Sequence, residues 1–289
     1  MIQISNENLL VQVSPKGAEL QSIANKETGL EYLWSGDPAF WPKKSPVLFP
    51  IVGGLKNNTY TFNDKSYNLG RHGFARDMAF TVTAQSSGQV TFTLESNEQS
   101  RLVYPFEFRF SITYTIIDNA VQVTYLVENK VTGNMYFSVG AHPAFRVPLV
   151  DGTSYEDYYL QFEKVENAGR FPLSPEGLIE LTAEPYLSST NQLPLKKSLF
   201  EKDALVFKNL QSNSITICTS KAEHGVRLSY EDFPYMGIWA AKGADFVCIE
   251  PWCGIADSVN ASRKLEEKEG INTLASGQTF TRSYTINTW

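Results

Sequence analysis

The sequence has little of what a disulfide scaffold or a metal centre requires. It contains three cysteines, Cys218, Cys248 and Cys253, an odd number at no metal-ligand spacing. We therefore expect free thiols that pack as small hydrophobic residues in a reducing compartment. His72, His142 and one carboxylate could in principle bind a metal ion, but their spacing matches no metal motif. We therefore expect no metal.

Signals for membrane insertion or export are also missing. No apolar run approaches the ~18 residues that are needed to cross a bilayer. The residues after Met1 enter an alternating pattern directly, without the basic and apolar regions of a signal peptide. The sequence thus predicts a cytoplasmic protein with no membrane partner.

Positive charge is scarce and scattered. The chain has 25 Lys and Arg against 31 Asp and Glu, and no basic stripe, so we expect no nucleic-acid partner. A Walker loop and a G-x-G-x-x-G motif are both absent, which argues against nucleotide cofactors. No serine lies in a G-x-S-x-G setting, and no cysteine has the basic or helical neighbours of a nucleophile. We expect no cofactor of any kind.

What the chain does contain is a strong strand pattern. Aromatic residues make up 13% of the sequence, and they favour strands. Phe106–Ile116 alternates apolar and polar residues, Asp118 and Asn119 make a turn, and Val121–Val127 alternates back. Tyr60–Phe62 and Ser66–Leu69 predict a second hairpin.

Few segments favour a helix, and the strands set the fold class. Only Ser262–Gly270 predicts a short surface helix. After the middle of the chain, short strands are expected at Tyr158–Phe162 and Leu178–Leu181. Many strands with few helices predict an all-β protein built as a large antiparallel β-sandwich. No repeat or linker interrupts the chain, so we expect one domain over residues 1–289.

The most informative stretch is Met135–Phe145, with the sequence MYFSVGAHPAF. It begins as a strand, stops at Gly140 and then presents His142 between Ala141 and Pro143. Proline fixes its own φ and biases the preceding residue toward extended backbone, so His142 has little freedom. A histidine held in this way is well placed to face a cleft. The alternative is a histidine that simply bonds a backbone partner in a strand cap.

A second stretch, Phe246–Asp257, repeats this arrangement. Its apolar strand is expected to end at Glu250, which Pro251 follows. A carboxyl group beside Trp252 is partly desolvated, and this raises its pKa toward neutrality. Glu250 is therefore a candidate base, the alternative being a glutamate paired with an arginine. Together with an imidazole, it suggests paired proton transfer.

A polar loop at Arg71–Asp77 offers binding groups. It gathers two guanidiniums, one imidazole and one carboxylate around a glycine, from Arg71, Arg76, His72 and Asp77 around Gly73. Loops carried by rigid sheets are where binding groups concentrate, so we favour a binding role over an ordinary solvated loop.

Five pieces of the sequence, in this order, carry a resemblance to a known family. They are FPIVGGLKNNTYTFNDKSY at Phe49–Tyr67, RHGFARD at Arg71–Asp77, GAHPAF at Gly140–Phe145, DALVF at Asp203–Phe207 and FPYMGIWAAKGADFVCIEPWCGIAD at Phe233–Asp257. The chain resembles the aldose 1-epimerase (mutarotase) family, and specifically its LacX-like branch, over nearly its whole length. The resemblance implies a galactose-mutarotase-like supersandwich with a sugar in an open cleft.

The resemblance also implies roles. His142 falls at the position of the general acid and Glu250 at that of the general base, whereas His72 and Asp203 match sugar-binding positions. Arg76 matches the basic residue of the HGFAR motif found in this branch and in related hexose-6-phosphate epimerases. The family commonly carries an arginine where this chain has Gly54, so this cation is either missing or replaced by Arg71 or Arg76. Four aromatic residues are candidates for apolar surfaces that pack against one face of the sugar, namely Trp239, Trp252, Phe74 and Phe145. The alternative is that they belong to the core.

These assignments predict an aldose 1-epimerase that interconverts the α and β anomers of a hexose by acid–base ring opening and reclosure. Three alternatives remain open at this point: a hexose-6-phosphate 1-epimerase, a non-catalytic sugar-binding or sensor protein, and a two-carboxylate glycosidase that uses Glu250 and Asp203. The expected partner is a small-molecule hexose or hexose phosphate, and the expected state is a monomer or homodimer.

Overall fold

The computed structural model describes residues 1–289, and almost all regular structure in it is β. The largest sheet has nine antiparallel strands. In spatial order these are β14 (Glu184–Pro194), β13 (Tyr158–Arg170), β16 (Ser214–Thr219), β17 (Val226–Ser229), β21 (Thr279–Thr288), β9 (Ala120–Asn129), β8 (Phe108–Ile117), β7 (Gln89–Glu95) and β6 (Thr81–Gln85).

Four smaller sheets complete the fold. A five-stranded sheet contains β11 (Val139–Gly140), β19 (Phe246–Cys253), β18 (Tyr235–Trp239), β15 (Leu205–Lys208) and β12 (Ala144–Arg146). A three-stranded sheet contains β1 (Ile2–Ser5), β2 (Leu9–Ser14) and β3 (Glu19–Asn25). The two-stranded sheets are β10 (Met135–Phe137) with β20 (Asn272–Leu274), and β4 (Thr59–Phe62) with β5 (Lys65–Asn68).

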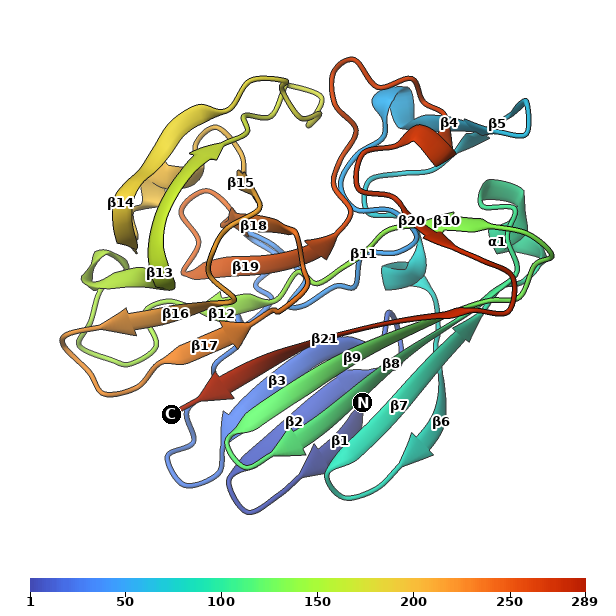
Figure 1. Cartoon of the computed structure of the whole chain (residues 1–289). Coiled ribbons are helices and arrows are strands. Elements are labelled where there is room, and N and C mark those ends of the chain that lie inside the picture. The colour runs from blue at the N-terminus through green and yellow to red at the C-terminus, as the bar shows by residue number, and fades with distance from the viewer.

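The sheets pack face to face. Figure 1 shows β1–β3 lying against the β8–β9 part of the large sheet. Alternate residues of β2 are buried, and they share one hydrophobic core with the inward-facing residues of β7, β8 and β9. The hydroxyl of Tyr114 donates to the carbonyl of Ala18 at 2.7 Å, which ties the two layers together. The predicted all-β class and large antiparallel sandwich are thereby confirmed, while the single domain, the oligomeric state and the cytoplasmic location stay predictions.

Both predicted hairpins are present. β8 and β9 pair along their whole length, and every second residue of β9 is buried, as the alternating sequence requires. In the β4–β5 hairpin, Asn63 and Asp64 make the turn with φ of 47° and 59°. Asparagine and aspartate tolerate this left-handed conformation better than most residues, which is why the turn forms at this point.

The helix prediction is only partly right. Ser262–Gly270 forms a 3₁₀ turn at Leu265–Glu267, whereas the one α-helix, α1, spans Glu98–Val103 and was not expected. Asn97 caps α1 in a capping box with Ser100, a sequence signal that could have located it. The remaining 3₁₀ turns are Lys56–Asn58, Ala75–Asp77, Tyr155–Asp157 and Lys197–Phe200. No helix has the length and apolar character that a membrane crossing requires.

The region between β13 and β14 differs most from the prediction. β13 continues eight residues beyond the expected Tyr158–Phe162, and its second half pairs with β14 across several register shifts. Leu178–Leu181 is not a strand, since Ile179 forms only isolated bridges with Leu173 and Ser258. Polar, irregular pairing of this kind lacks the alternation on which strand prediction depends.

Candidate active site

A cavity of ≈ 550 Å³ opens over the five-stranded sheet. Eight of the ten residues that the sequence predicts for catalysis or binding line it, namely Arg71, His72, Arg76, His142, Asp203, Trp239, Glu250 and Trp252. The rest of the lining consists of Trp41, Gly53, Leu173, Gly177, Ile179, Ala204, Val206 and Ala256. Its volume falls within the range of small-molecule sites, and it combines apolar walls with a few convergent polar groups.

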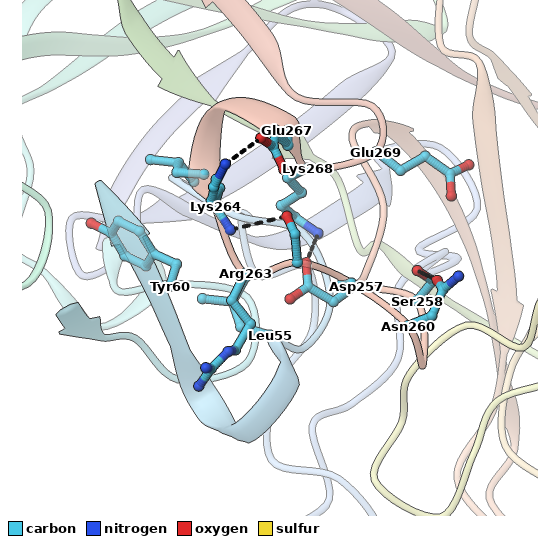
Figure 2. A pocket seen from close by; sticks show the side chains of 13 residues that line it. Leu55, Tyr60, Asp257, Ser258, Asn260, Arg263, Lys264, Glu267, Lys268 and Glu269 are labelled. Carbon is cyan, nitrogen blue, oxygen red and sulfur yellow. Dashed lines mark hydrogen bonds and ion pairs between the residues drawn. The ribbon is translucent and has the colours of Figure 1, made fainter. Parts of the chain in front are cut away.

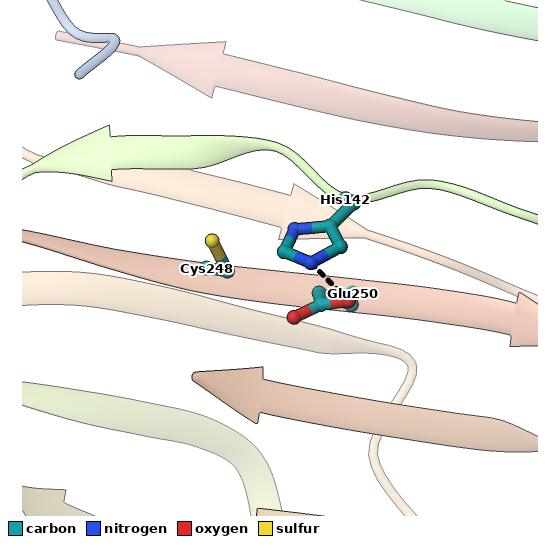
Figure 3. Close-up of side chains that lie close together, drawn as sticks. All are labelled: His142, Cys248 and Glu250. Atoms are coloured by element: carbon teal, nitrogen blue, oxygen red, sulfur yellow. Dashed lines mark ion pairs between the residues drawn. The ribbon is translucent and has the colours of Figure 1, made fainter. Parts of the chain in front are cut away.

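Strand register brings the two proposed catalytic residues together. β11 pairs with β19 through Gly140 and Trp252, and β12 pairs with β19 through Ala144 and Cys248. His142 lies in the interval between β11 and β12, so it faces Glu250 directly across the strand pair. Its Nε2 lies 3.3 Å from Oε2 of Glu250, as Figure 3 shows.

One detail of the sequence prediction is wrong. Glu250 does not end its strand, because β19 continues through Pro251 to Cys253. Proline is tolerated there because the ladder needs only its carbonyl, which accepts from the N–H of Ala141 at 3.0 Å. Glu250 therefore pairs with Gly237 of β18 on one side and lies between the pairings of β11 and β12 on the other, so it is more rigid than a strand-end residue would be.

Burial sets the protonation of this pair. Glu250 is 2% exposed, and burial raises the pKa of its carboxyl well above the usual value, an effect that the nearby charge of Asp203 reinforces. The indole N–H of Trp252 counteracts part of this rise without reaching hydrogen-bond geometry. Burial likewise lowers the pKa of His142 to about 3. Burial therefore favours the uncharged form of each group, a protonated carboxyl on Glu250 and a neutral imidazole on His142.

Aromatic rings hold His142 in place. The ring of Trp41 stacks on the imidazole with centroids 4.9 Å apart, and the ring of Trp239 meets it edge-on at 5.7 Å. These contacts restrict the imidazole to one orientation. Its Nδ1 is buried and has no hydrogen-bond partner, so the predicted alternative of a histidine satisfied by a backbone group does not describe this nitrogen.

A reciprocal backbone contact orients His72. The N–H of Gly53 donates to His72 Nδ1 at 3.1 Å, and the N–H of His72 donates to the Gly53 carbonyl at 2.8 Å. Burial and the charges of His142 and the neighbouring arginines keep the pKa of His72 well below its ordinary value. Because Nδ1 accepts, the neutral ring carries its proton on Nε2 and offers it as a donor.

Gly53 is needed for this arrangement. It has a φ of 70°, and a Cβ at this position would clash with the Cβ of Ala256. Only glycine adopts this conformation freely and lets the two segments approach so closely.

The two arginines face carboxylates at the cavity rim. Nη1 of Arg71 lies 4.0 Å from Oδ2 of Asp203, and Nε of Arg76 lies 3.8 Å from Oδ2 of Asp77. Arg76 also donates to the carbonyl of Arg71 at 3.0 Å. These groups are partly exposed, so the ion pairs contribute little to stability and the guanidiniums can be offered to a ligand.

The neighbourhood of Gly54 supports the idea that Arg71 supplies a replacement cation. A Cβ at Gly54 would point toward the carbonyl of Gly177, 3.9 Å away. The guanidinium of Arg71 rests on this same turn, because a Cβ at Gly177 would overlap its Nη2. Arg71 thus lies in the direction in which a side chain at position 54 would extend.

Two of the predicted aromatic platforms lie outside the cavity. The ring of Phe74 packs against Phe49, Tyr104 and Phe108, and Phe145 is fully buried in the core. Phe74 follows His72 by two residues, but here the chain turns into the 3₁₀ segment Ala75–Asp77, and the ring enters the core instead.

Sequence reasoning missed other lining residues. Trp41 was not among the predicted site residues, and Leu173, Gly177 and Ile179 come from the irregular segment between β13 and β14. No local pattern in that segment marks it as a cavity wall. Only the packing of the segment over the five-stranded sheet reveals its place.

A second cavity, of ≈ 300 Å³, lies beside the 3₁₀ turn at Leu265–Glu267 and contains a buried ion pair. Figure 2 shows Lys268 and Asp257 in contact there, with Nζ to Oδ1 at 2.8 Å. Lys268 Nζ also donates to the carbonyl of Ile255, and Oδ2 of Asp257 accepts from the N–H of Lys56. This cavity has no proton-transfer pair comparable to His142 and Glu250, and its charges tie loops together.

The comparisons with known proteins agree with the fold and the site. The family model described as "Aldose 1-epimerase" matches residues 1–287, and the chain belongs to this family. Membership supports a mutarotase-type function in general terms and implies a sugar substrate. Within the family, the chain is 36% identical to the chromosomally encoded protein LacX of Lactococcus lactis subsp. lactis, over 99% of this chain and 98% of that protein.

Solved structures give the same result. A galactose mutarotase related enzyme from Lactobacillus acidophilus superimposes with a TM-score of 0.95 at 36% identity, covering 100% of this chain and 97% of the other. A galactose mutarotase-like protein from Lactobacillus casei ATCC 334 has a TM-score of 0.94 at 32% identity, covering 100% of both chains. The predicted family and the galactose-mutarotase-like fold are thus confirmed.

Proposed function

We propose that this protein is an aldose 1-epimerase that interconverts the α and β anomers of a free hexose. The observation that carries the proposal is the contact between Nε2 of His142 and Oε2 of Glu250 inside a sugar-sized cavity. Opening a cyclic hemiacetal requires one proton removed from the anomeric hydroxyl and one delivered to the ring oxygen. A pair of groups that can each give and take a proton meets that requirement without a cofactor.

The number of protons that His142 and Glu250 hold together suits this chemistry. A neutral imidazole with a protonated carboxyl holds the same number of protons as an imidazolium with a carboxylate. Transfer of one proton from Glu250 to His142 therefore produces the working acid and base without changing the charge of the site. The short separation of the two groups makes this transfer direct.

The proposed cycle returns the pair to its starting state. Glu250 takes the anomeric proton while His142 protonates the ring oxygen, the bond between C1 and that oxygen breaks, and C1 becomes a carbonyl. Rotation about C1–C2 presents the other carbonyl face. His142 then removes the proton from the ring hydroxyl as it attacks C1, and Glu250 returns a proton to the carbonyl oxygen. Each such contact contributes roughly 10²–10⁴-fold to the rate.

The other cavity groups fit sugar binding. His72 offers the Nε2 proton as a donor, Asp203 offers acceptor oxygens and Arg71 offers a cation to ring hydroxyls. Trp239 and Trp252 give apolar surface for the C–H face of a pyranose.

Polarimetry tests the proposal. Freshly dissolved α-D-glucose and α-D-galactose change rotation slowly by themselves, and catalytic amounts of the protein should accelerate this change for at least one of them. If calorimetry detects sugar binding but rotation changes at the uncatalysed rate for both sugars, the protein is a binding or sensor protein and the epimerase proposal fails.

The arginines at the cavity rim favour testing one second substrate class, the hexose 6-phosphates. Because Arg71 and Arg76 already face Asp203 and Asp77, we expect glucose 6-phosphate to bind no more tightly than glucose. Competition of glucose 6-phosphate against glucose exchange measures this. Arg76→Gln should change the KM values for both sugars by a similar factor.

The opposite outcome would identify a phosphate substrate. In that case glucose 6-phosphate would compete strongly, and Arg76→Gln would weaken its binding about 10-fold or more without affecting free glucose. Arg109→Gln is the matched control, because it removes a guanidinium that pairs with Glu95 and Glu128 and does not line the cavity.

A further inference from the structure

Cys248 adds a thiol to the proton-transfer pair. It precedes Glu250 by two residues on β19, so the two side chains point to the same face of the sheet. One ligating atom each from His142, Cys248 and Glu250 lies within 4.8 Å of the others. Figure 3 shows the sulfur beside the imidazole, which contacts the carboxylate below it.

These groups have unused binding capacity. Cys248 is free and fully buried. The thiols of Cys218 and Cys253 lie within hydrogen-bond reach of backbone carbonyls, whereas that of Cys248 makes no such contact. His142 is 8% exposed, and its Nδ1 has no partner. An imidazole, a thiol and a carboxyl whose ligating atoms approach this closely in a buried place are a combination that points to a cation.

We propose that His142, Cys248 and Glu250 form a binding site for a thiophilic divalent cation such as Zn²⁺, and that the bound cation inhibits the protein. Nitrogen, sulfur and oxygen from these residue types are the donors that zinc takes in proteins. The inhibitory half of this inference rests on the proposed function, whereas the binding half does not.

The geometry requires only a small adjustment. In a tetrahedral site with bonds of about 2.0–2.3 Å, neighbouring ligand atoms are about 3.5 Å apart. Nε2 of His142 and Oε2 of Glu250 are already 3.3 Å apart. The ligating atoms of the cluster lie within 4.8 Å of one another, so the sulfur of Cys248 needs to approach by about 1.3 Å at most. His142 and Glu250 line the cavity, which leaves the fourth position to water or to a sugar hydroxyl.

Charge balance favours the cation in this buried place. Binding releases one proton from the Cys248 thiol and the one proton that His142 and Glu250 share. The thiolate and the carboxylate then neutralise the two positive charges, so the occupied site is uncharged and the cost of burying an unpaired charge is avoided. No oxidant or reductant takes part.

Occupancy blocks proton transfer for a direct reason. The cation takes the lone pair of the imidazole and the oxygen of the carboxylate, and neither group can then exchange a proton with a sugar. The site is therefore inhibitory and not a cofactor site. It also differs from the set considered from the sequence, because Cys248 takes the place of His72.

Cobalt absorption tests the binding half without any assay of activity. Co²⁺ bound to a thiolate gives a sulfur-to-metal charge-transfer band in the near ultraviolet. We expect this band in the parent and in Cys253→Ala, whose thiol is also buried but lies outside the cluster. The band should be absent in both Cys248→Ala and Cys248→Ser. One of these variants is enough for the test, provided that it keeps the circular dichroism spectrum of the parent. A band that is missing in the parent, or unchanged in the Cys248 variants, overturns the inference.

Inhibition tests the second half. Zn²⁺ should slow anomer exchange by the parent and by Cys253→Ala, while Cys248→Ala should keep its activity without metal and need at least ~10-fold more Zn²⁺ for the same inhibition. Equal sensitivity of all three variants overturns this half. If the protein proves inactive on every sugar, the cobalt band still decides whether the site exists, so failure of the proposed function and failure of this inference are told apart.

Discussion

Replacing Glu250 by glutamine is expected to slow anomer exchange by about 10²–10⁴-fold, the contribution of one general acid–base group. Glutamine has the shape of the protonated carboxyl that burial favours here, but its amide cannot exchange a proton during the reaction. The fold should remain intact because a neutral amide replaces a carboxyl group whose neutral form is favoured by burial. Polarimetry gives the rate, and circular dichroism with thermal melting checks the fold.

Substitution of His142, the proposed partner of Glu250, makes this test more specific. His142→Gln should cause a loss of similar size, and the double variant should be little slower than either single one, because the two groups act as a unit. Glu223→Gln is the control, since Glu223 is exposed and lies outside the cavity. A Glu250→Gln variant as fast as the parent would remove this residue from the mechanism. Losses that simply multiply in the double variant would mean that the two residues act independently.

Replacing Lys268 by methionine is expected to lower the free energy of unfolding by about 3–5 kcal/mol. Lys268 and Asp257 are 8% and 3% exposed, and their ion pair is almost completely buried. Methionine keeps most of the apolar length of the side chain but leaves the Asp257 carboxylate unpaired and the Ile255 carbonyl without its donor. Denaturant titration measures the change.

The same substitution should also weaken sugar binding. Asp257 accepts from the N–H of Lys56 and donates its own N–H to the carbonyl of Gly54, so it fixes the segment that carries Gly53. Gly53 in turn orients His72. We therefore expect Lys268→Met to raise KM more than it lowers kcat.

A neighbouring lysine provides the control for this prediction. Lys264 pairs with Glu267 beside the same cavity, but both side chains are about half exposed, and Lys264→Met should leave the free energy of unfolding almost unchanged. Exchanging both members of the buried pair, as in the double variant Asp257→Asn with Lys268→Met, should recover part of the lost stability, because it removes the unpaired charge. Equal effects of Lys264→Met and Lys268→Met would contradict the role of burial.

The sequence identified the chemical groups of the candidate site, but it was less accurate about the strands and neighbours that hold them. His142 and Glu250 stand out because a proline follows each, and both line the cavity. Glu250 was nevertheless expected at a strand end, because proline usually breaks a ladder. Here Pro251 faces a partner strand that needs only its carbonyl, and that pairing is decided by residues far away in the chain.

Errors in side-chain direction have a similar origin. Phe74 and Trp239 are both aromatic and both near proposed site residues, yet one ring enters the core and the other faces the cavity. Which way a ring points depends on the turn that follows it and on the neighbours that surround it. Likewise, Trp41 and the segment around Gly177 carry no local sign that they close over the imidazole.

By itself, the sequence determined the all-β class, the main hairpins, the family and the kinds of chemical group available, because alternation, turn residues and ordered motifs are local properties of a chain. Only the tertiary structure decided which of these groups meet. The contact of His142 with Glu250, the approach of Gly53 to Ala256, the thiol of Cys248 beside the pair and the buried link between Lys268 and Asp257 all join segments whose positions are set by strand register and packing. Those are long-range properties, and no local pattern encodes them.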